Sequence, residues 1–273
     1  MTGFDHPEYT AQIDGAIDLS ELQGILQIDT IEKMAGSADV SFSAHGKPAK
    51  ATPSVSDFRN FETNGKIQMK GISIQLKGKP EPFDSINGML SFDGNNVEIS
   101  GFRARTPSSD LHVDGSVKNL LGFIFTDKEV LDISGEMSSS NLNLNTLLGG
   151  TTSTPAGGNS DYHLDLPPRI KCNLKTSVHH VVFRHFDASD LSTDLVLNNK
   201  RLLVDPISFH SMDGAFDGSG MIDGTMRDSL LMTCNANIRD VNITKLFYQF
   251  ENFGQEKDTV ITWNNVRSEE HTS

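Results

Sequence analysis

The sequence predicts an all-β fold: an elongated, curled antiparallel meander sheet that repeats as a β-groove, with a few short capping helices. Apolar and polar residues alternate along several runs, turn signals separate these runs, and a block of runs recurs about one hundred residues further along the chain. Alternation with a period of two indicates strands with one buried and one solvated face. Short turns between such strands indicate sequential antiparallel pairing.

The alternation is clearest in the second half of the chain. From Ile170 to Val178 every second residue is Ile, Cys, Leu, Thr or Val, and polar residues stand between them. Met232–Ile238 follows the same pattern. In Lys66–Gly78 the apolar phase shifts by one residue near Gly71. A β-bulge at this glycine would return the apolar side chains to one face.

Turn signals separate the alternating runs at three places: Asp93-Gly94, Asn198–Lys200 and Asp213-Gly214. Asp, Asn and Gly accept the positive φ angles that tight hairpins need. We therefore expect hairpins at all three places.

Three Leu- and Phe-rich segments predict short helices, and each begins near a residue suited to an N-cap. We interpret them as caps over the end of the sheet rather than as membrane-inserting helices. They are Ser20–Leu26, Asn119–Phe125 and Thr244–Phe250.

The chain divides into a first β segment, residues 1–84, and a region with two related repeats, residues 85–148 and 166–255. In each repeat a hairpin and a long strand are followed by further strands and a Leu-rich end. Repeats that stack edge to edge build an elongated sheet rather than a closed ball.

The two ends of the chain predict a fragment of a longer protein. The first residues show no signal peptide, and residues 256–273 depart from the strand pattern. Arg267–Ser273 reads like the in-frame translation of a common sequencing adapter, so we exclude residues 267–273 from the expected fold.

Composition argues against several classes of function. Lys and Arg total 23 against 36 acidic residues, for a formal charge of −13. A nucleic-acid partner needs a basic face, so none is expected. Cys172 and Cys234 cannot form a disulfide framework, and whether they pair is left open.

No pattern of catalytic or metal-binding residues stands out, so we predict no enzyme, no cofactor and no metal. His179 and His180 are adjacent, and strand alternation would send them to opposite faces. Gly218-Ser219-Gly220 lacks the spacing of a nucleophile elbow. Asp-Gly pairs are expected to form turns rather than calcium loops.

Several motifs occur together and in order. The first repeat contains Gly88–Asn95, Ser109–Gly115 and Ser138–Leu148, and the second contains Leu166–Pro168, Gly214–Met221 and Phe250–Gln255. In this combination, from about Ser85 to Gln255, the chain resembles the C-terminal region of the AsmA family, which is related to the TamB-type bridge-like lipid transfer proteins.

The resemblance implies a function and a location. It implies a periplasmic β-groove module that binds phospholipid acyl chains and supports lipid transport and outer-membrane biogenesis. The full-length protein would be anchored to the inner membrane by an N-terminal helix that this sequence lacks. Phospholipid, the envelope membranes and outer-membrane assembly proteins are the expected partners.

The expected lining of the groove consists of the apolar residues that alternation places on one face. Composition alone favours the core of a closed sandwich for this face, and the resemblance favours a groove. The residues are Leu111, Val113, Ile170, Cys172, Leu174, Val178, Leu195, Leu197, Met232, Cys234, Ala236 and Ile238.

Two other functions compete with lipid transport. One is an envelope scaffold for outer-membrane assembly whose apolar face packs on partner β-structure without moving lipid. The other is a surface β-sandwich binding module for carbohydrate or adhesion. Sugar binding uses exposed aromatic rings, and the chain has one Trp and three Tyr, so we rank this function last.

Overall fold

The computed structural model describes residues 9–23, 31–46, 62–125, 128–147, 166–226 and 231–250. The expected adapter-like end, residues 267–273, and the rest of residues 256–273 lie outside these ranges. The strands are β1 (Tyr9–Asp18), β2 (Ile31–Gly46), β3 (Glu62–Leu76), β4 (Phe83–Asp93), β5 (Asn96–Arg105), β6 (Asp110–Lys118), β7 (Leu131–Ser139), β8 (Leu142–Asn143), β9 (Ile170–Phe183), β10 (Phe186–Asn198), β11 (Arg201–Ser211), β12 (Gly214–Asp223) and β13 (Leu231–Arg239).

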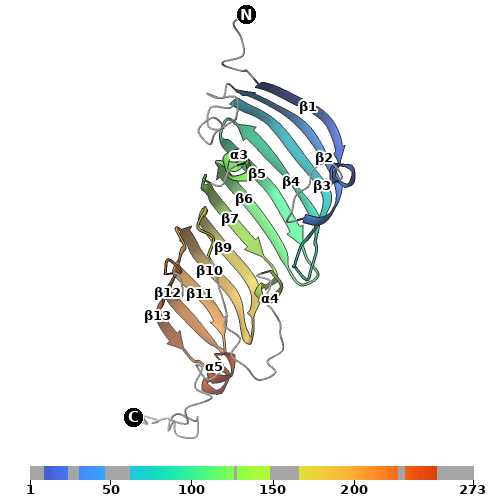
Figure 1. Ribbon diagram of the computed structural model, residues 1–273. Helices are drawn as coiled ribbons and strands as arrows, with labels where there is room; N and C mark the ends of the chain where they lie inside the picture. The colour runs from blue at the N-terminus through green and yellow to red at the C-terminus, as the bar shows by residue number, and fades with distance from the viewer. Residues whose placement is uncertain are drawn as a thin grey trace, which may run out of the picture.

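All of these strands belong to one 13-stranded sheet. Twelve of them lie side by side in chain order from β1 to β13, and the short β8 pairs with β9 off this path. The sheet is open and curled, with β1 and β13 at its two ends (Figure 1). The predicted all-β, elongated fold is confirmed for the described residues, and these strands do not form a two-sheet sandwich.

One strand pair departs from the predicted antiparallel meander. β9 pairs with β7 in parallel, from Leu131 opposite Ile170 to Ser139 opposite Val178. The chain can do this because a long connection, residues 140–169, separates the two strands, and parallel neighbours need such a crossover. All other neighbours along the path are antiparallel.

The predicted hairpins are present. Gly94 has a φ of 57° in the turn between β4 and β5, and Asn199 and Lys200 have φ values of 47° and 59° between β10 and β11. The turn between β11 and β12 uses positive φ at Met212 and Asp213, one residue earlier than predicted. Two consecutive positive φ angles match the twist of the flanking strands.

The predicted bulge at Gly71 is also confirmed. Its φ is 56°, its N–H donates to the side chain of Asn87 at 2.9 Å, and the β3–β4 register shifts there. A similar shift occurs in β5, where Gly101 has a φ of 59° and its N–H donates to Asp114 at 2.6 Å. Such bulges let a strand bend while its apolar residues stay on one face.

The described residues form four short helices beside the sheet: α1 (Leu19–Gln23), α3 (Leu120–Phe125), α4 (Leu144–Leu147) and α5 (Ile243–Gln249). Asn242 caps α5 and accepts a hydrogen bond from the Lys245 N–H at 3.2 Å, so the helix begins one residue before the predicted Thr244. Among the residues that the structure describes, no helix is long and apolar enough to cross a membrane.

Candidate functional site

The candidate site is one face of the sheet, which we call the apolar face. Strand register aligns its side chains in rows that run across the strands. The first row has one member on each of twelve strands: Ile13, Phe42, Gly65, Phe92, Val97, Val117, Ile133, Cys172, Leu197, Leu202, Ile222 and Met232.

A second row runs beside the first across the same twelve strands. It consists of Gly15, Val40, Ile67, Leu90, Ile99, Gly115, Gly135, Leu174, Leu195, Val204, Gly220 and Cys234. Neither row contains a charged or hydrogen-bonding polar side chain other than the two thiols. At about 4.8 Å per strand, each row is roughly 50 Å long.

The twelve residues predicted to line a groove all lie on this face. Cys172, Leu197 and Met232 belong to the first row, and Leu174, Leu195 and Cys234 belong to the second. The other six lie on the same face but outside the two rows. Ile170 lies at the start of β9, opposite Leu131, and the remaining five lie beyond the second row: Leu111, Val113, Val178, Ala236 and Ile238.

Among the first seven strands of the path, sequence reasoning named lining residues on β6 alone. Phe42, Phe92, Val97, Val117 and Ile133 belong to the first row but were not predicted as lining residues. The hairpin at Asp93-Gly94 was the available signal, because a tight turn there places Phe92 opposite Val97.

Burial along the apolar face differs between its middle and its end. Leu174 and Leu195, which face each other, are half-buried, whereas Cys172 and Val178 are buried. On β13 the predicted lining residues are exposed, and Met232 has 71% of its surface accessible. The expectation of a buried face on this strand is wrong: among the described strands β13 pairs with β12 alone, so its side chains have a neighbouring strand on one side only.

Two glycines of the second row let β6 and β7 approach closely. Gly115 and Gly135 face each other, and a Cβ atom on Gly115 would lie 2.8 Å from the Gly135 Cα and closer still to the Ser134 carbonyl oxygen. The reciprocal Cβ on Gly135 would lie 2.7 Å from the Gly115 Cα. The absence of side chains here therefore keeps the two strands together.

Short helices cover the ends of the strands on this face. Leu120 of α3 packs against the cluster of Phe92, Val97 and Val117. At the other end, Leu142 and Leu144 pack against the cluster of Val178, Val181 and Ala188. The predicted capping role of the short helices thus holds for α3. The half-buried Leu174 and Leu195 lie between the part of the face that α3 covers and the part that Leu142 and Leu144 cover.

Arg169 holds α3 in place. Its Nε donates to the Glu129 carbonyl at 3.1 Å, and its Nη2 donates to the Phe123 carbonyl at 2.9 Å. The guanidinium carbon also lies 4.6 Å from the centre of the Phe123 ring, within cation–π range. One side chain therefore joins the start of β9 to the helix that covers the first row.

Asp110 stabilises the turn that leads from β7 to β8 and α4, which carry Leu142 and Leu144. Its carboxylate accepts hydrogen bonds from the N–H groups of Asn141 at 2.8 Å and of Ser140 at 3.0 Å. Burial raises the pKa of Asp110, but these hydrogen bonds outweigh it and hold the pKa below its usual value. The ionised carboxylate thus stabilises the turn between β7 and β8.

His179 and His180 each pair with an aspartate. His179 lies 2.9 Å from Asp190, while His180 contacts Asp187 at 3.1 Å and Asn141 at 2.8 Å. The two histidines therefore have different partners. Within the described ranges, no group of three His, Cys, Asp or Glu side chains could hold a metal ion.

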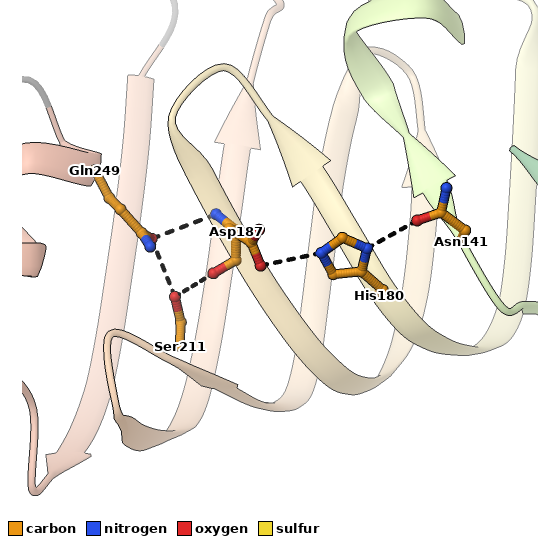
Figure 2. A network of polar contacts seen from close by, with 5 residues as sticks. All are labelled: Asn141, His180, Asp187, Ser211 and Gln249. Carbon is orange, nitrogen blue, oxygen red and sulfur yellow. Dashed lines mark hydrogen bonds and ion pairs between the residues drawn. The ribbon is translucent and has the colours of Figure 1, made fainter. Parts of the chain in front are cut away.

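A polar network connects α5 to the sheet (Figure 2). Gln249 accepts hydrogen bonds from the Ser211 hydroxyl at 3.0 Å and from the Asp187 N–H at 3.4 Å. His180 joins Asp187 to Asn141 at the other end of the network. The Ser211 hydroxyl also contacts the backbone carbonyl of Asp187.

The two cysteines are separate free thiols. Cys172 is buried on β9, and Cys234 is exposed on β13, four strands away along the sheet. Neighbouring strands are about 4.8 Å apart, so the two thiols are too far apart for a disulfide. Burial raises the pKa of the Cys172 thiol.

Comparison with known proteins adds no family to this description. No protein-family model, no curated protein and no solved structure matches the chain. The resemblance to the AsmA family therefore stays a prediction from the sequence motifs.

Proposed function

We propose that the apolar face is a groove that holds the acyl chains of phospholipids, in a periplasmic module of an AsmA-like envelope protein that supports lipid transport. The observation that favours this function is the pair of apolar rows that cross twelve strands without a polar side chain other than the two thiols. The described strands form one sheet, so no second sheet covers these rows.

The chemistry of the face suits hydrocarbon chains. An acyl chain makes no directional bonds, and each methylene group transferred from water to an apolar surface contributes about 0.8 kcal/mol. The second row offers such a surface to an extended chain through its half-buried residues, among them Leu90, Leu174 and Leu195. Half-buried aliphatic residues without a cover would otherwise be costly to leave in water.

The test is native mass spectrometry with lipid extraction on the chain purified from a bacterial host. We expect bound phospholipid on the unaltered protein, and loss of that lipid when Leu174 and Leu195 are both changed to Asp. The matched control changes Asn173 and Ser192 to Asp, because these two exposed residues lie on the same strands but on the polar face.

The outcomes separate lipid binding from a scaffold function. Lipid retained by the control and lost by the Leu174→Asp/Leu195→Asp variant, with unchanged circular dichroism, supports the groove. A folded protein that is free of lipid in all three forms contradicts it, and would favour the scaffold that packs its apolar face on partner β-structure.

A further inference from the structure

His180 lies between two oxygen atoms, one at each nitrogen of its ring (Figure 2). Its Nδ1 is 2.8 Å from the Oδ1 of Asn141, and its Nε2 is 3.1 Å from the Oδ1 of Asp187. Asn141 belongs to the turn between β7 and β8, His180 to β9 and Asp187 to β10. The ring of His180 therefore connects this turn to two strands of the sheet.

Both oxygen atoms are hydrogen-bond acceptors. The ionised carboxylate of Asp187 has no proton to donate. The amide of Asn141 has a fixed orientation, because its Nδ2 donates to the Ser108 carbonyl at 2.6 Å and its Oδ1 then faces the ring. A neutral imidazole has one N–H group and an imidazolium has two, so only the protonated ring of His180 can donate to both partners at once.

The turn that contains Asn141 leads to a short cover on one end of the apolar face. Residues 142–147, which we call the β8–α4 cover, follow this turn directly. Leu142 and Leu144 of the cover pack against the cluster that contains Val178. Loss of a hydrogen bond at His180 would therefore weaken the attachment of the cover to the sheet.

Other contacts hold the cover in a way that does not change between pH 5 and 8. Asp110 accepts hydrogen bonds from the turn, and because its pKa lies below the usual value despite burial, it stays ionised throughout this range. The N–H of Asn143 donates to the Ser109 hydroxyl at 2.9 Å, and β8 pairs with β9 through the backbone. The cover thus stays attached when His180 loses its proton, and only part of its stability depends on pH.

The other titratable groups near His180 have partners of their own. They lie on β9, on β11, in the turn after β9 and on α5, and the pairs are His179 with Asp190, His210 with Asp190, His185 with the ring of Tyr248, and Lys245 with Asp213. Within the part of the chain that the structure describes, Asp187 is the charged partner of the His180 ring. Histidine is the side chain that ordinarily changes its charge between pH 5 and 8, so His180 is the group of this link that responds to pH.

We propose that His180 is a proton-dependent link that holds the β8–α4 cover against the sheet. Below the range in which histidine titrates, the imidazolium donates to Asn141 and Asp187 together; above it, the neutral ring donates to one of them and the cover opens more often. Opening exposes the cluster that contains Val178, next to Leu174 on the same strand, and so gives the apolar face a pH-dependent access. The consequence for lipid rests on the proposed function, whereas the link itself does not.

Hydrogen exchange of the cover, measured by NMR without lipid, tests this link. The exchange rate of the Asn143 N–H is measured at about pH 5.5 and about pH 7.5, on either side of the usual titration of histidine, and is divided by the intrinsic rate at each pH. We expect protection to be about threefold higher at the lower pH, the factor that one exposed charged pair gives. The N–H of Gly71, which donates to Asn87 far from the cover, is the internal reference and should show no such difference.

His180→Gln should abolish the difference, because glutamine does not titrate in this range. The matched control is His179→Gln, which removes the neighbouring histidine and its own aspartate pair and should keep the difference. Asp187→Ala, which removes the charged acceptor at an exposed side chain, gives a second test and should also abolish it.

Two results would overturn the proposal. One is a pH difference of the same size in the unaltered protein and in His180→Gln, because another group would then be responsible. The other is equal protection at the two pH values in the unaltered protein. Because no lipid is present, either result can be obtained whether or not the apolar face binds phospholipid.

Discussion

The close approach of β6 and β7 gives a sharp prediction about stability. Gly135→Ala would place a Cβ atom 2.7 Å from the Gly115 Cα and closer still to the Asp114 carbonyl oxygen. Both obstacles are backbone atoms, so no side chain can rotate away, and the strands must separate. Overpacking of this kind costs about 3 kcal/mol, at the upper end of the usual range.

The matched control is Gly220→Ala, which lies in the same row of the apolar face. Its Cβ would meet the Val204 Cγ2 methyl at 3.2 Å, a contact that a shift of a few tenths of an ångström relieves, and no backbone atom closer than 3.8 Å. Alanine also reduces the entropy of the unfolded chain, which stabilises the protein by roughly 0.4–1 kcal/mol. Gly220→Ala should therefore be close to neutral.

Thermal and urea denaturation, each followed by circular dichroism, measure the stability of both variants. For a chain of this size, 3 kcal/mol corresponds to a decrease in Tm of about 6–12 °C. Gly135→Ala should lower the urea midpoint clearly, and Gly220→Ala should leave it within error. Equal stability of Gly135→Ala and the unaltered protein would refute the close approach, as would an equal loss in both variants.

Three further predictions concern the thiols and the two covers. Cys234 should react with a maleimide within minutes and Cys172 only on unfolding, because burial protects the second thiol and raises its pKa; equal rates would contradict the register of β9. Asp110→Asn should destabilise by about 1 kcal/mol near pH 7. The pKa of Asp110 is lowered in the folded protein, so this stability difference should be present above pH ~4 and should vanish as the pH falls through the folded pKa. Urea titrations at several pH values measure it. A difference that persists at pH 2 would contradict a stabilising role of the ionised carboxylate. Arg169→Met should cost about 2 kcal/mol in the same titrations by releasing α3, and no loss would mean that the helix is held by packing alone.

Much of the strand pairing could be predicted because it depends on short sequence motifs, such as turn residues and the alternation of apolar and polar residues. A two-residue turn determines which residues face each other, so the hairpins at Asp93-Gly94 and Asn198–Lys200 gave the register of their strands. The bulge at Gly71 followed from a one-residue change of apolar phase. Alternation then placed all twelve expected lining residues on one face.

The parallel pairing of β7 and β9 could not be predicted in this way. The residues between these strands include β8, α4 and a connection outside the described residues. No turn motif in this part of the sequence predicts which strand β9 pairs with, or in which direction. The exposure of the β13 side chains could not be predicted either. Alternation indicates which face of the sheet a side chain lies on, but not whether neighbouring strands bury it.

The most direct test of the proposed groove asks which face of the sheet touches lipid. In a cysteine-free chain (Cys172→Ala, Cys234→Ser), a fluorophore is placed by Leu195→Cys or by Val196→Cys, two adjacent half-buried positions of β10 on opposite faces. Phospholipid with a nitroxide on its acyl chain is then added. We predict strong quenching at position 195 and little at position 196; equal quenching at the two positions, or none at either, would contradict the account.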